Sequence, residues 1–302
     1  MKIKESEYDI SVIMPTYNRS NLLEYSLRSL AMQDIDRSTF EVVIGDDGSS
    51  DDTREVIRPY EDRINIQYVW QEDKGYRPAS ARNNALKLAK GKICLFIDSG
   101  IMVSQDCLRR HIEFHEEAGP DKAAIGYVYG FDHVGEAEVR LRNMINIDDP
   151  AASILEIGKF REYHDVRNRH YIVHNDRVED MPAPWAFFWS GHISLSRENL
   201  FKVGLFDEQF DGRWGAEDID LGYRVYLANI EIRLLRNASC IHYPHNTEKT
   251  EKEVQGLENV IYFNSKYRTP ETEMYLKCFT DPDYLNVNEA LLQMKSSVEN
   301  MT

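Results

Sequence analysis

The sequence predicts an α/β fold, in which a mostly parallel central sheet is covered by helices on both faces. Apolar strand-like runs alternate with helix-like runs through roughly the first 130 residues, which is typical of parallel sheets with crossover helices. Several strand-like runs end in polar residues, at the edge of the sheet where ligands bind in such folds. The chain has 302 residues, 42% of them hydrophobic and 29% charged, so it can bury a sizeable core.

The first part of the chain is expected to contain five strands and four helices. Residues 9–16 form an apolar run that ends in proline and polar residues, and three leucines at helical spacing follow within residues 20–33. Residues 63–70 alternate between apolar and polar side chains, as a half-buried strand does. The same reasoning gives the other elements: strands at 40–46, 92–98 and 123–131, and helices at 51–60, 77–90 and 104–117.

The second part of the chain alternates less regularly. Residues 132–184 are charged and weakly periodic, so we expect loops and short helices along one wall of a cleft, with one helix at 151–158. Aromatic residues from Trp185 onward predict a strand that gives way to a helix near Ser196. The last expected elements are a helix from Glu217, a strand at 231–243 and helical structure beyond Thr247.

The composition excludes some classes of partner and site. A net charge of -15 argues against nucleic acid as the main partner, because binding to its backbone needs a basic face. The chain begins without an apolar signal region and has no apolar run near the length of a membrane span. A cytoplasmic protein is therefore expected, with peripheral membrane association left open. Four cysteines without close spacing, Cys94, Cys107, Cys240 and Cys278, are expected to be reduced and buried.

Acidic residues stand where two predicted strands end. Asp46 and Asp47 open the run DDGSSDDT, which is either a turn with a helix cap or a carboxylate site for a uracil N–H or a ribose diol. Asp98 ends the strand KICLFID. A carboxylate beside a diphosphate would repel it, so Asp98 indicates a Mg²⁺ or Mn²⁺ ion between the two.

Two further segments combine acids or histidines with a predicted element boundary. Glu217 and Asp218 stand at a helix start, where acids are favourable in any case, but where one could also act as a general base. Trp214 would shape a loop over the substrate. His242 and His245 follow the late strand, and an imidazole close to Asp98 would complete a metal site.

The motifs SVIMPTYNR, VVIGDDGSSDDT, RPASARNNAL, LFIDSG and GRWGAEDIDLGYRV together resemble family 2 glycosyltransferases of the GT-A fold. The segment from Ser190 to Val225 also looks like the C-terminal part of galactosyltransferases and of bacterial chondroitin-type polymerases. The match runs from Ile10 to His245 in the family's motif order. It implies one GT-A domain: a donor-binding half at 1–130, an acceptor-binding and catalytic half at 131–250, and a helical C-terminal extension at 251–302.

The resemblance implies a hexosyl- or N-acetylhexosaminyl-transferase that takes a nucleotide sugar, usually a UDP-sugar, and inverts the anomeric carbon. Asp218 would be the catalytic base, and Glu217 would bind sugar or acceptor hydroxyls. Asp98 would be the first acid of the DxD motif and would share a metal with His242. The remaining donor-site residues implied are Pro15, Thr16, Tyr17, Asp46, Asp47, Arg77, Arg82, Asn83 and Trp214.

The sequence departs from the DxD pattern at Gly100, where a second acid is expected. Three alternatives follow: a weakly held Mg²⁺ or Mn²⁺ on Asp98 and His242, a metal-independent site in which Arg77 or Arg82 neutralises the diphosphate, or an inactive enzyme. We favour the metal because Asp98 is present. A donor-binding partner subunit without transfer activity is the alternative function, and a nucleotidyltransferase ranks last because PTYNRSN has no glycine.

The acceptor is not defined by the sequence. It could be a glycan, a small metabolite, a lipid-linked sugar or a protein side chain. Aromatic side chains that could stack on sugar faces, or equally pack in the core, are Trp185, Phe187, Phe188, Trp189 and Trp214.

Overall fold

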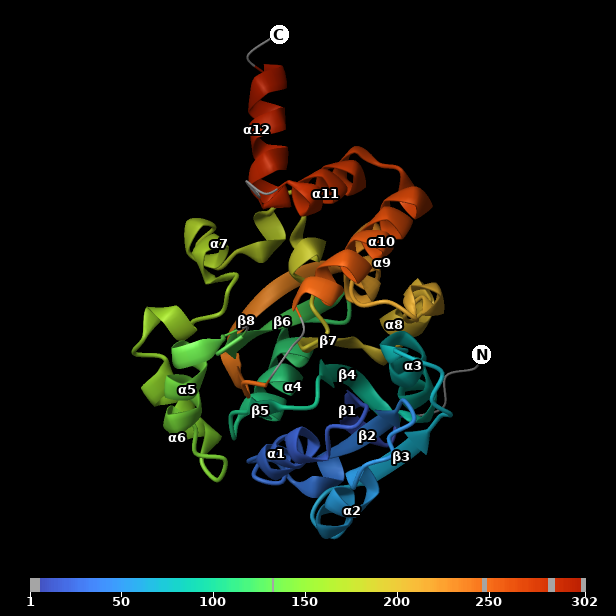
Figure 1. The fold of residues 1–302 in the computed structure, drawn as a ribbon, viewed down its shortest axis with the longest axis vertical. Coiled ribbons are helices and arrows are strands. Elements are labelled where there is room, and N and C mark those ends of the chain that lie inside the picture. The colour runs from blue at the N-terminus through green and yellow to red at the C-terminus, as the bar shows by residue number, and fades with distance from the viewer. Residues whose placement is uncertain (1–5, 132, 246–248, 282–285, 300–302) are drawn as a thin grey trace.

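The computed structural model describes residues 6–131, 133–245, 249–281 and 286–299. Within them, a single eight-stranded sheet runs through the molecule in the order β3-β2-β1-β4-β7-β6-β8-β5, with helices packed around it (Figure 1). The predicted α/β fold is therefore confirmed. The sheet is mixed, since it combines a parallel half with a half that contains antiparallel pairings.

The first half of the chain forms the parallel part of the sheet. Its strands are β1 (Tyr8–Thr16), β2 (Phe40–Asp46), β3 (Ile66–Trp70) and β4 (Gly91–Ile97), and its helices are α1 (Ser20–Leu30), α2 (Thr53–Ile57) and α3 (Pro78–Leu88). Strand β1 pairs in parallel with both β2 and β4. Helix α3 lies very close to β2 because Gly45 has no side chain; a Cβ there would be 2.3 Å from the Ala81 carbonyl oxygen.

The second half of the chain completes the sheet and adds its antiparallel pairings. Its strands are β5 (Ile101–Val103), β6 (Lys122–Tyr129), β7 (His192–Ser196) and β8 (Glu231–His242), and its helices are α4 (Cys107–Ala118), α5 (Gly135–Met144), α6 (Pro150–Ile157), α7 (Asn168–Val173), α8 (Arg197–Val203) and α9 (Glu217–Leu227). Strand β7 lies between β4 and β6 and is antiparallel to both, whereas β6 and β8 are parallel.

Alternate residues of the strands build two cores, one on each face of the sheet. On β1, for example, Ile13 belongs to one cluster, while Val12 and Met14 belong to the other. Leucines of α1 and Cys107 of α4 pack in the second cluster, and residues of α3, α8 and α9 pack in the first. Helices therefore cover both faces of the sheet, as the sequence predicts.

The C-terminal segment contributes to the same fold. Its helices are α10 (Lys249–Tyr267), α11 (Pro270–Thr280) and α12 (Val287–Glu299). Val260 and Phe263 of α10 are buried in the first core cluster, where Phe263 packs on Trp185 with 5.6 Å between ring centroids. Helix α12 extends away from the sheet (Figure 1). The described residues of this segment are thus mainly helical, as expected, and α10 is also part of the core.

Two details of the fold differ from the sequence prediction. Residues Pro184–Phe187 form a 3₁₀ helix rather than a strand, because the aromatic side chains of this segment turn into the core on several sides. Trp185, Phe187 and Phe188 are buried there, so they pack in the core and are not free to stack on an acceptor. The short strand β5 was not expected, since three residues are too few to show a period.

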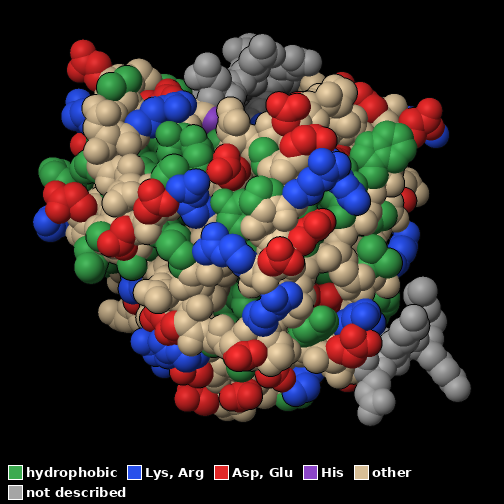
Figure 2. Space-filling view, turned by 90° about the horizontal axis from the view of Figure 1, so that it is seen from below, with side chains coloured by type: hydrophobic (Ala, Val, Ile, Leu, Met, Phe, Trp, Pro, Cys, Tyr) green, Lys and Arg blue, Asp and Glu red, His purple; other side chains and the backbone are tan. Residues whose placement is uncertain are grey.

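The cysteines agree with the expectation, and two further observations concern surface charge and membrane spans. All four cysteines are free and buried. Acidic and basic side chains are interspersed over the face seen in Figure 2, with no broad patch of one sign. Across the part of the chain that the structure describes, no helix combines the length and apolar character that a membrane crossing requires.

Candidate active site

Arg82 connects the end of a central strand with the start of helix α9. Its Nη2 donates to Oδ1 of Asp98 over 2.9 Å, and its Nη1 donates to Oε1 of Glu217 over 3.0 Å. Asp98 directly follows β4, and Glu217 is the first residue of α9. Arg82 and Glu217 are buried, whereas 42% of the Asp98 side chain is exposed. Burial lowers the pKa of Arg82, but the two carboxylates outweigh it and raise that pKa.

Asp218 lies beside this cluster and is held by backbone amides. The N–H of Ser190 donates to one carboxylate oxygen over 3.1 Å, and the N–H of Ile219 donates to the other over 2.8 Å. Part of the residue stays exposed, but its carboxylate is deep enough that loss of water is the largest cause of a raised pKa. The negative charge of Glu217 adds to this effect, and the pKa of Asp218 reaches about 7.

The loop before α9 is shaped by positive backbone angles. Gly215 has a φ of 91° and Ala216 a φ of 68°, and the left-handed conformation is unusual for a residue with a Cβ. The side chain of Asn259, on α10, donates its Nδ2 hydrogens to the carbonyl oxygens of Phe210, Arg213 and Gly215 over 3.1, 3.2 and 2.8 Å. Helix α10 thus fixes the loop that places Glu217 and Asp218.

Trp214 stands on the same loop, as the motif predicts. Its side chain is 36% exposed, and its backbone N–H donates to Oε1 of Gln255 on α10 over 3.1 Å. The indole packs against Gly256, whose Cβ, if present, would be 3.3 Å from the ring. The indole is therefore anchored on one side by α10 while part of its surface faces solvent.

The two acids at the end of β2 are buried and already form hydrogen bonds within the protein. Asp46 accepts hydrogen bonds from the N–H groups of Gly48 and Ser49 and from the Tyr68 hydroxyl, at 3.0, 2.7 and 2.6 Å. Asp47 accepts from Gln71 Nε2 and from the N–H of Arg77, both at 2.6 Å, and the Arg77 guanidinium lies 3.2 Å from it. Burial raises the pKa of Asp47 despite these contacts.

The residues that end β1 differ in what they offer a ligand. The hydroxyl of Thr16 is buried and has no hydrogen-bond partner among the described residues. Tyr17 is 41% exposed, and its hydroxyl donates to Asp73 over 2.9 Å. Pro15 is partly buried, and its carbonyl accepts from the Ser99 hydroxyl, next to Asp98, over 2.8 Å. The ends of β1 and β4 therefore meet, as expected for neighbouring parallel strands.

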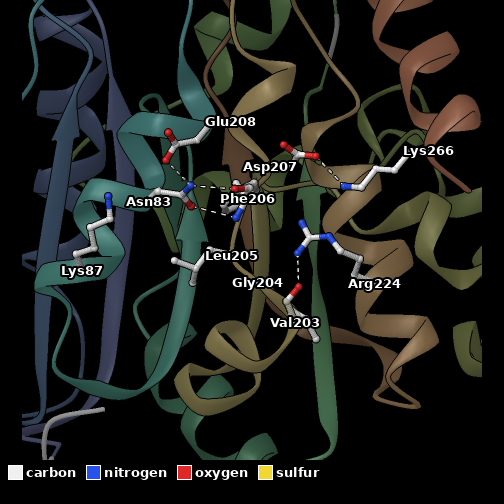
Figure 3. Close-up of a pocket in the computed structure, with 10 residues that line it drawn as sticks. All are labelled: Asn83, Lys87, Val203, Gly204, Leu205, Phe206, Asp207, Glu208, Arg224 and Lys266. Atoms are coloured by element: carbon white, nitrogen blue, oxygen red, sulfur yellow. Dashed lines mark hydrogen bonds and ion pairs between the residues drawn. The ribbon is translucent and has the colours of Figure 1, made fainter. Parts of the chain in front are cut away.

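Asn83 differs from its expected role in lining the donor site. Its amide is buried: Nδ2 donates to the Phe206 carbonyl and to Glu208, each over 2.9 Å, and Oδ1 accepts from the Phe206 N–H. Asn83 and Phe206 both line a pocket of about 520 Å³, shown in Figure 3, whose lining residues include neither Asp98 nor Asp218. The structure gives Asn83 a role in fixing the segment after α8, and we no longer count it as a donor contact.

Strand pairing brings His242 to the segment after Asp98. Ile101 pairs with His242 in the β5–β8 ladder, and the Tyr243 N–H donates to the Gly100 carbonyl over 2.9 Å. The His242 ring packs at 5.0 Å from the His245 ring. Gly100 has a φ of 99°, a conformation that favours glycine, which gives a physical reason for the absence of a second acid at this position.

Three further residues of the site were missed by sequence reasoning. Arg19 lies 3.3 Å from His245, between its Nη1 and the ring Nε2. Tyr76 is 44% exposed, yet burial of its hydroxyl and the charge of Glu217 raise its pKa. Ser190 holds Asp218 through its N–H. Arg19 and Tyr76 lie within two positions of predicted site residues in the chain, so proximity to the motifs could have identified them. A backbone contact such as that of Ser190 leaves no signal in the sequence.

Comparison with protein families decides the assignment. Residues 11–200, more than half of the chain, match the family model described as glycosyl transferase family 2. The chain belongs to glycosyltransferase family 2. Residues 170–246 also match the model described as the N-terminal domain of galactosyltransferase. This family membership removes the nucleotidyltransferase alternative.

Curated family 2 relatives are longer than this chain. A validoxylamine A glucosyltransferase from Streptomyces hygroscopicus subsp. jinggangensis is 38% identical over 236 residues, which cover 78% of this chain and 56% of that protein. The chondroitin synthase of Escherichia coli is 28% identical over 256 residues, which cover 83% of this chain and 37% of that protein. The chain thus spans about half of the first relative's length and less of the second.

Solved structures of other glycosyltransferases share the fold. The structure of Staphylococcus aureus TarS 1–349 in complex with UDP-GlcNAc aligns with a TM-score of 0.62 at 20% identity, covering 92% of this chain and 72% of that one. A Pyrobaculum calidifontis mannosyltransferase in complex with GDP-Man and Mn²⁺ aligns with a TM-score of 0.58 at 18% identity, covering 98% of this chain and 78% of that one. The GT-A fold expected from the motifs is confirmed.

Proposed function

We propose that this protein is an inverting glycosyltransferase that transfers a hexose or N-acetylhexosamine from a nucleotide sugar, most simply a UDP-sugar, to an acceptor hydroxyl. The observation that carries the proposal is the shared guanidinium of Arg82, which brings Asp98 and Glu217 into one cluster beside Asp218. The family membership and the UDP-GlcNAc complex of a protein with the same fold support a nucleotide-sugar donor.

Asp218 is the proposed general base. Single displacement needs a group that takes the acceptor's hydroxyl proton as its oxygen attacks the anomeric carbon, while the nucleoside diphosphate leaves from the opposite face. A carboxylate with a pKa of about 7 is ionised in a useful fraction near neutral pH and is a stronger base than an exposed aspartate. The Ser190 and Ile219 amides orient it.

Glu217 is proposed to bind a hydroxyl of the sugar or acceptor. One of its carboxylate oxygens accepts from Arg82, and a carboxylate can accept further hydrogen bonds on its second oxygen. Because Arg82 also contacts Asp98, it keeps the acid of the strand end and the acid of the helix start in a fixed relation. This arrangement positions donor and acceptor groups against each other.

A divalent cation, Mg²⁺ or Mn²⁺, is the proposed cofactor. Three carboxylates and one guanidinium meet in this cluster, so a diphosphate would enter a site that is already negative. Asp98 and His242 would hold the ion, which would neutralise charge on the departing diphosphate. Among the described residues they belong to no group of three metal-ligating side chains, and this suits Mg²⁺ or Mn²⁺, which take few protein ligands and use phosphate oxygens and water.

The nucleotide is proposed to lie along the ends of β1 and β2. Thr16 offers a buried hydroxyl that lacks a partner among the described residues, and Tyr17 offers an exposed ring. Asp46 and Asp47 use several of their acceptor positions within the protein, so they would contact uracil or ribose through the positions that remain. Arg77, held by Asp47, brings a positive charge to this end of the site.

The acceptor is proposed to bind near the exposed aromatic residues of the second half. Trp214 is 36% exposed, and Trp189 is partly buried beneath the Arg167 guanidinium. An aromatic ring presents a flat apolar surface on which a sugar ring can stack. A glycan, a metabolite, a lipid-linked sugar and a protein side chain all stay open as acceptors.

The test is a donor screen with the full chain and the Asp218→Asn variant. We expect the parent protein to hydrolyse one UDP-sugar slowly and to lose at least about 100-fold of that rate in the variant, while calorimetry with Mn²⁺ finds unchanged donor affinity. Asp180→Asn, which changes an exposed carboxylate paired with Arg177 three residues earlier, is the matched control. A variant that turns over at the parent rate would refute Asp218 as base. Donor binding without any turnover in the parent would instead indicate a donor-binding subunit.

A further inference from the structure

A second cluster of side chains that could bind a metal shares no residue with the candidate active site. The structure groups Cys107, His111 and His192 so that one ligand atom from each lies within 4.8 Å of the others, and all three residues are buried. The Cys107 sulfur is 3.4 Å from His192 Nε2, and His111 Nε2 is 3.1 Å from the same nitrogen. Three ligand atoms thus converge on one point inside the fold.

From this geometry we propose that Cys107, His111 and His192 form a buried Zn²⁺ site, with Cys240 as the fourth ligand. A tetrahedral Zn²⁺ with ordinary bond lengths places two nitrogens about 3.3 Å apart and a sulfur about 3.6 Å from a nitrogen. The separations in the protein are close to both values. The proposal is separate from the cation expected at Asp98 and does not depend on the function proposed above.

The surrounding helix and strands hold these side chains in position for a metal ion. Cys107 and His111 are one turn apart on α4, so they point to the same side of the helix. The His192 ring lies directly over Gly126 of β6, where a Cβ would come within 2.2 Å of its Nδ1. Only a residue without a side chain admits the imidazole there. The Nδ1 of His111 lies 2.8 Å from the Ser194 hydroxyl, the kind of outer contact that orients a metal-binding histidine.

Cys240 is the residue best placed to complete the coordination. It pairs with Val103 in the β5–β8 ladder, four residues before Cys107, and it packs in the same core cluster as Cys107. Its sulfur is outside the close group of three, so it would have to shift to reach the ion. The charge balance favours Cys240 as a ligand. A Zn²⁺ ion bound by two thiolates and two neutral imidazoles forms an uncharged centre, whereas a buried net charge is costly. Both thiol protons would pass to solvent on binding.

The proposed centre is linked to Asp98 and Asp218 through the backbone just before His192. His192 begins β7, and Ser190, two residues earlier, donates its N–H to Asp218. A Cβ on the intervening Gly191 would be 3.8 Å from Asp98. A zinc ion that fixed the start of β7 would therefore hold in place the backbone that supports Asp218. A structural ion of this kind is expected to enter during folding and to resist removal afterwards.

The experiment measures metal directly. The full chain is produced in medium containing zinc, dialysed against EDTA and assayed by mass spectrometry. We expect about one zinc ion per chain in the parent protein. The zinc content should fall at least about tenfold in Cys107→Ser and in Cys240→Ser. It should not change in Cys278→Ser, which replaces a buried cysteine on α11. Asp98→Asn should keep its zinc, which separates this ion from the donor-site cation. Zinc retained in Cys107→Ser would refute the site. Zinc retained in Cys240→Ser would show that Cys240 is not the fourth ligand.

A second measurement tests the site without any substitution, in case the cysteine variants do not fold. The unmodified protein is refolded with Co²⁺ alone, and its absorption is recorded. Ligation by Cys107 gives a thiolate-to-cobalt charge-transfer band together with the intense visible bands of tetrahedral cobalt. If the refolded parent shows neither, and the zinc-grown protein holds no metal after dialysis, the cluster is a hydrogen-bonded core and the proposal is overturned.

Discussion

Arg82 donates a hydrogen bond to Asp98 over 2.9 Å while its other nitrogen holds Glu217. The two acids are 119 positions apart in the printed sequence, yet one planar guanidinium fixes their separation. Arginine can do this because its nitrogens form a rigid fork, whereas a lysine ammonium is a single point charge on a flexible chain. The relative position of these two carboxylates is therefore set by one residue.

We predict that Arg82→Lys folds but loses at least about 100-fold in turnover, because one of the two carboxylates is left without its partner and shifts. The measurement is sugar release from the UDP-sugar found in the donor screen, under saturating donor. Lys87→Arg, on the solvent side of the same helix and with charge retained, is the control. An Arg82→Lys protein that keeps its rate within about twofold would show that charge alone, without the fork, is sufficient.

Asp218 also predicts a dependence of stability on pH. Its pKa is raised from 3.8 to about 7, so between these values the folded protein binds more protons than the unfolded chain. The free energy of unfolding must then fall as the pH rises through this window. In Asp218→Asn the group does not titrate, and this contribution disappears.

We expect the free energy of unfolding of the parent, taken relative to Asp218→Asn, to decrease between about pH 4 and about pH 7 and to level off above. The decrease is at most about 1.4 kcal/mol for each pKa unit of the shift. Urea unfolding of both proteins across this range provides the values, with Asp180→Asn as the control. A relative stability that stays constant or rises with pH would contradict a raised pKa.

The sequence predicts the parts of this protein that depend on local pattern. The positions of Asp46 and Asp98 at strand ends could be predicted because an apolar run gives way to polar residues there. Asp218 could be assigned to the start of a helix because acidic residues are favourable at that position. Asn83 was misjudged because its place in a motif does not reveal that its amide is used by Phe206 and Glu208.

Contacts between distant segments leave no such pattern. Whether the aromatic run from Trp185 is a strand or a turn depends on the helices that surround it, which periodicity does not encode. In the same way, nothing around Asn259 in the sequence indicates that it holds a loop more than 40 residues earlier. These features are decided by tertiary packing.

Gly100 predicts the outcome of an attempt to restore the DxD motif. Its φ of 99° is unfavourable for any residue with a Cβ, so Gly100→Asp is expected to cost about 1–3 kcal/mol of stability. The strained segment would not present the new carboxylate in a fixed position, and we expect no gain in Mn²⁺ affinity by calorimetry. Gly119→Asp is the matched control, since Gly119 has a φ of 85° and open space around it. Tighter Mn²⁺ binding in Gly100→Asp alone would show that the turn accommodates a second acid.

Asn259 gives a prediction that separates positioning from stability. Its side chain donates to three carbonyl oxygens of the loop that ends at Glu217, so Asn259→Ala leaves buried acceptors unsatisfied at a cost of about 1–3 kcal/mol. The loop should loosen, and turnover should fall about 10- to 100-fold even well below the melting temperature. Val254→Ala, at an exposed position of the same helix, is the control and should change neither quantity. Single-turnover rates are measured at a temperature where both variants are folded. If the Asn259→Ala protein is less stable but turns over at the parent rate, Asn259 contributes to stability and does not position the loop for catalysis.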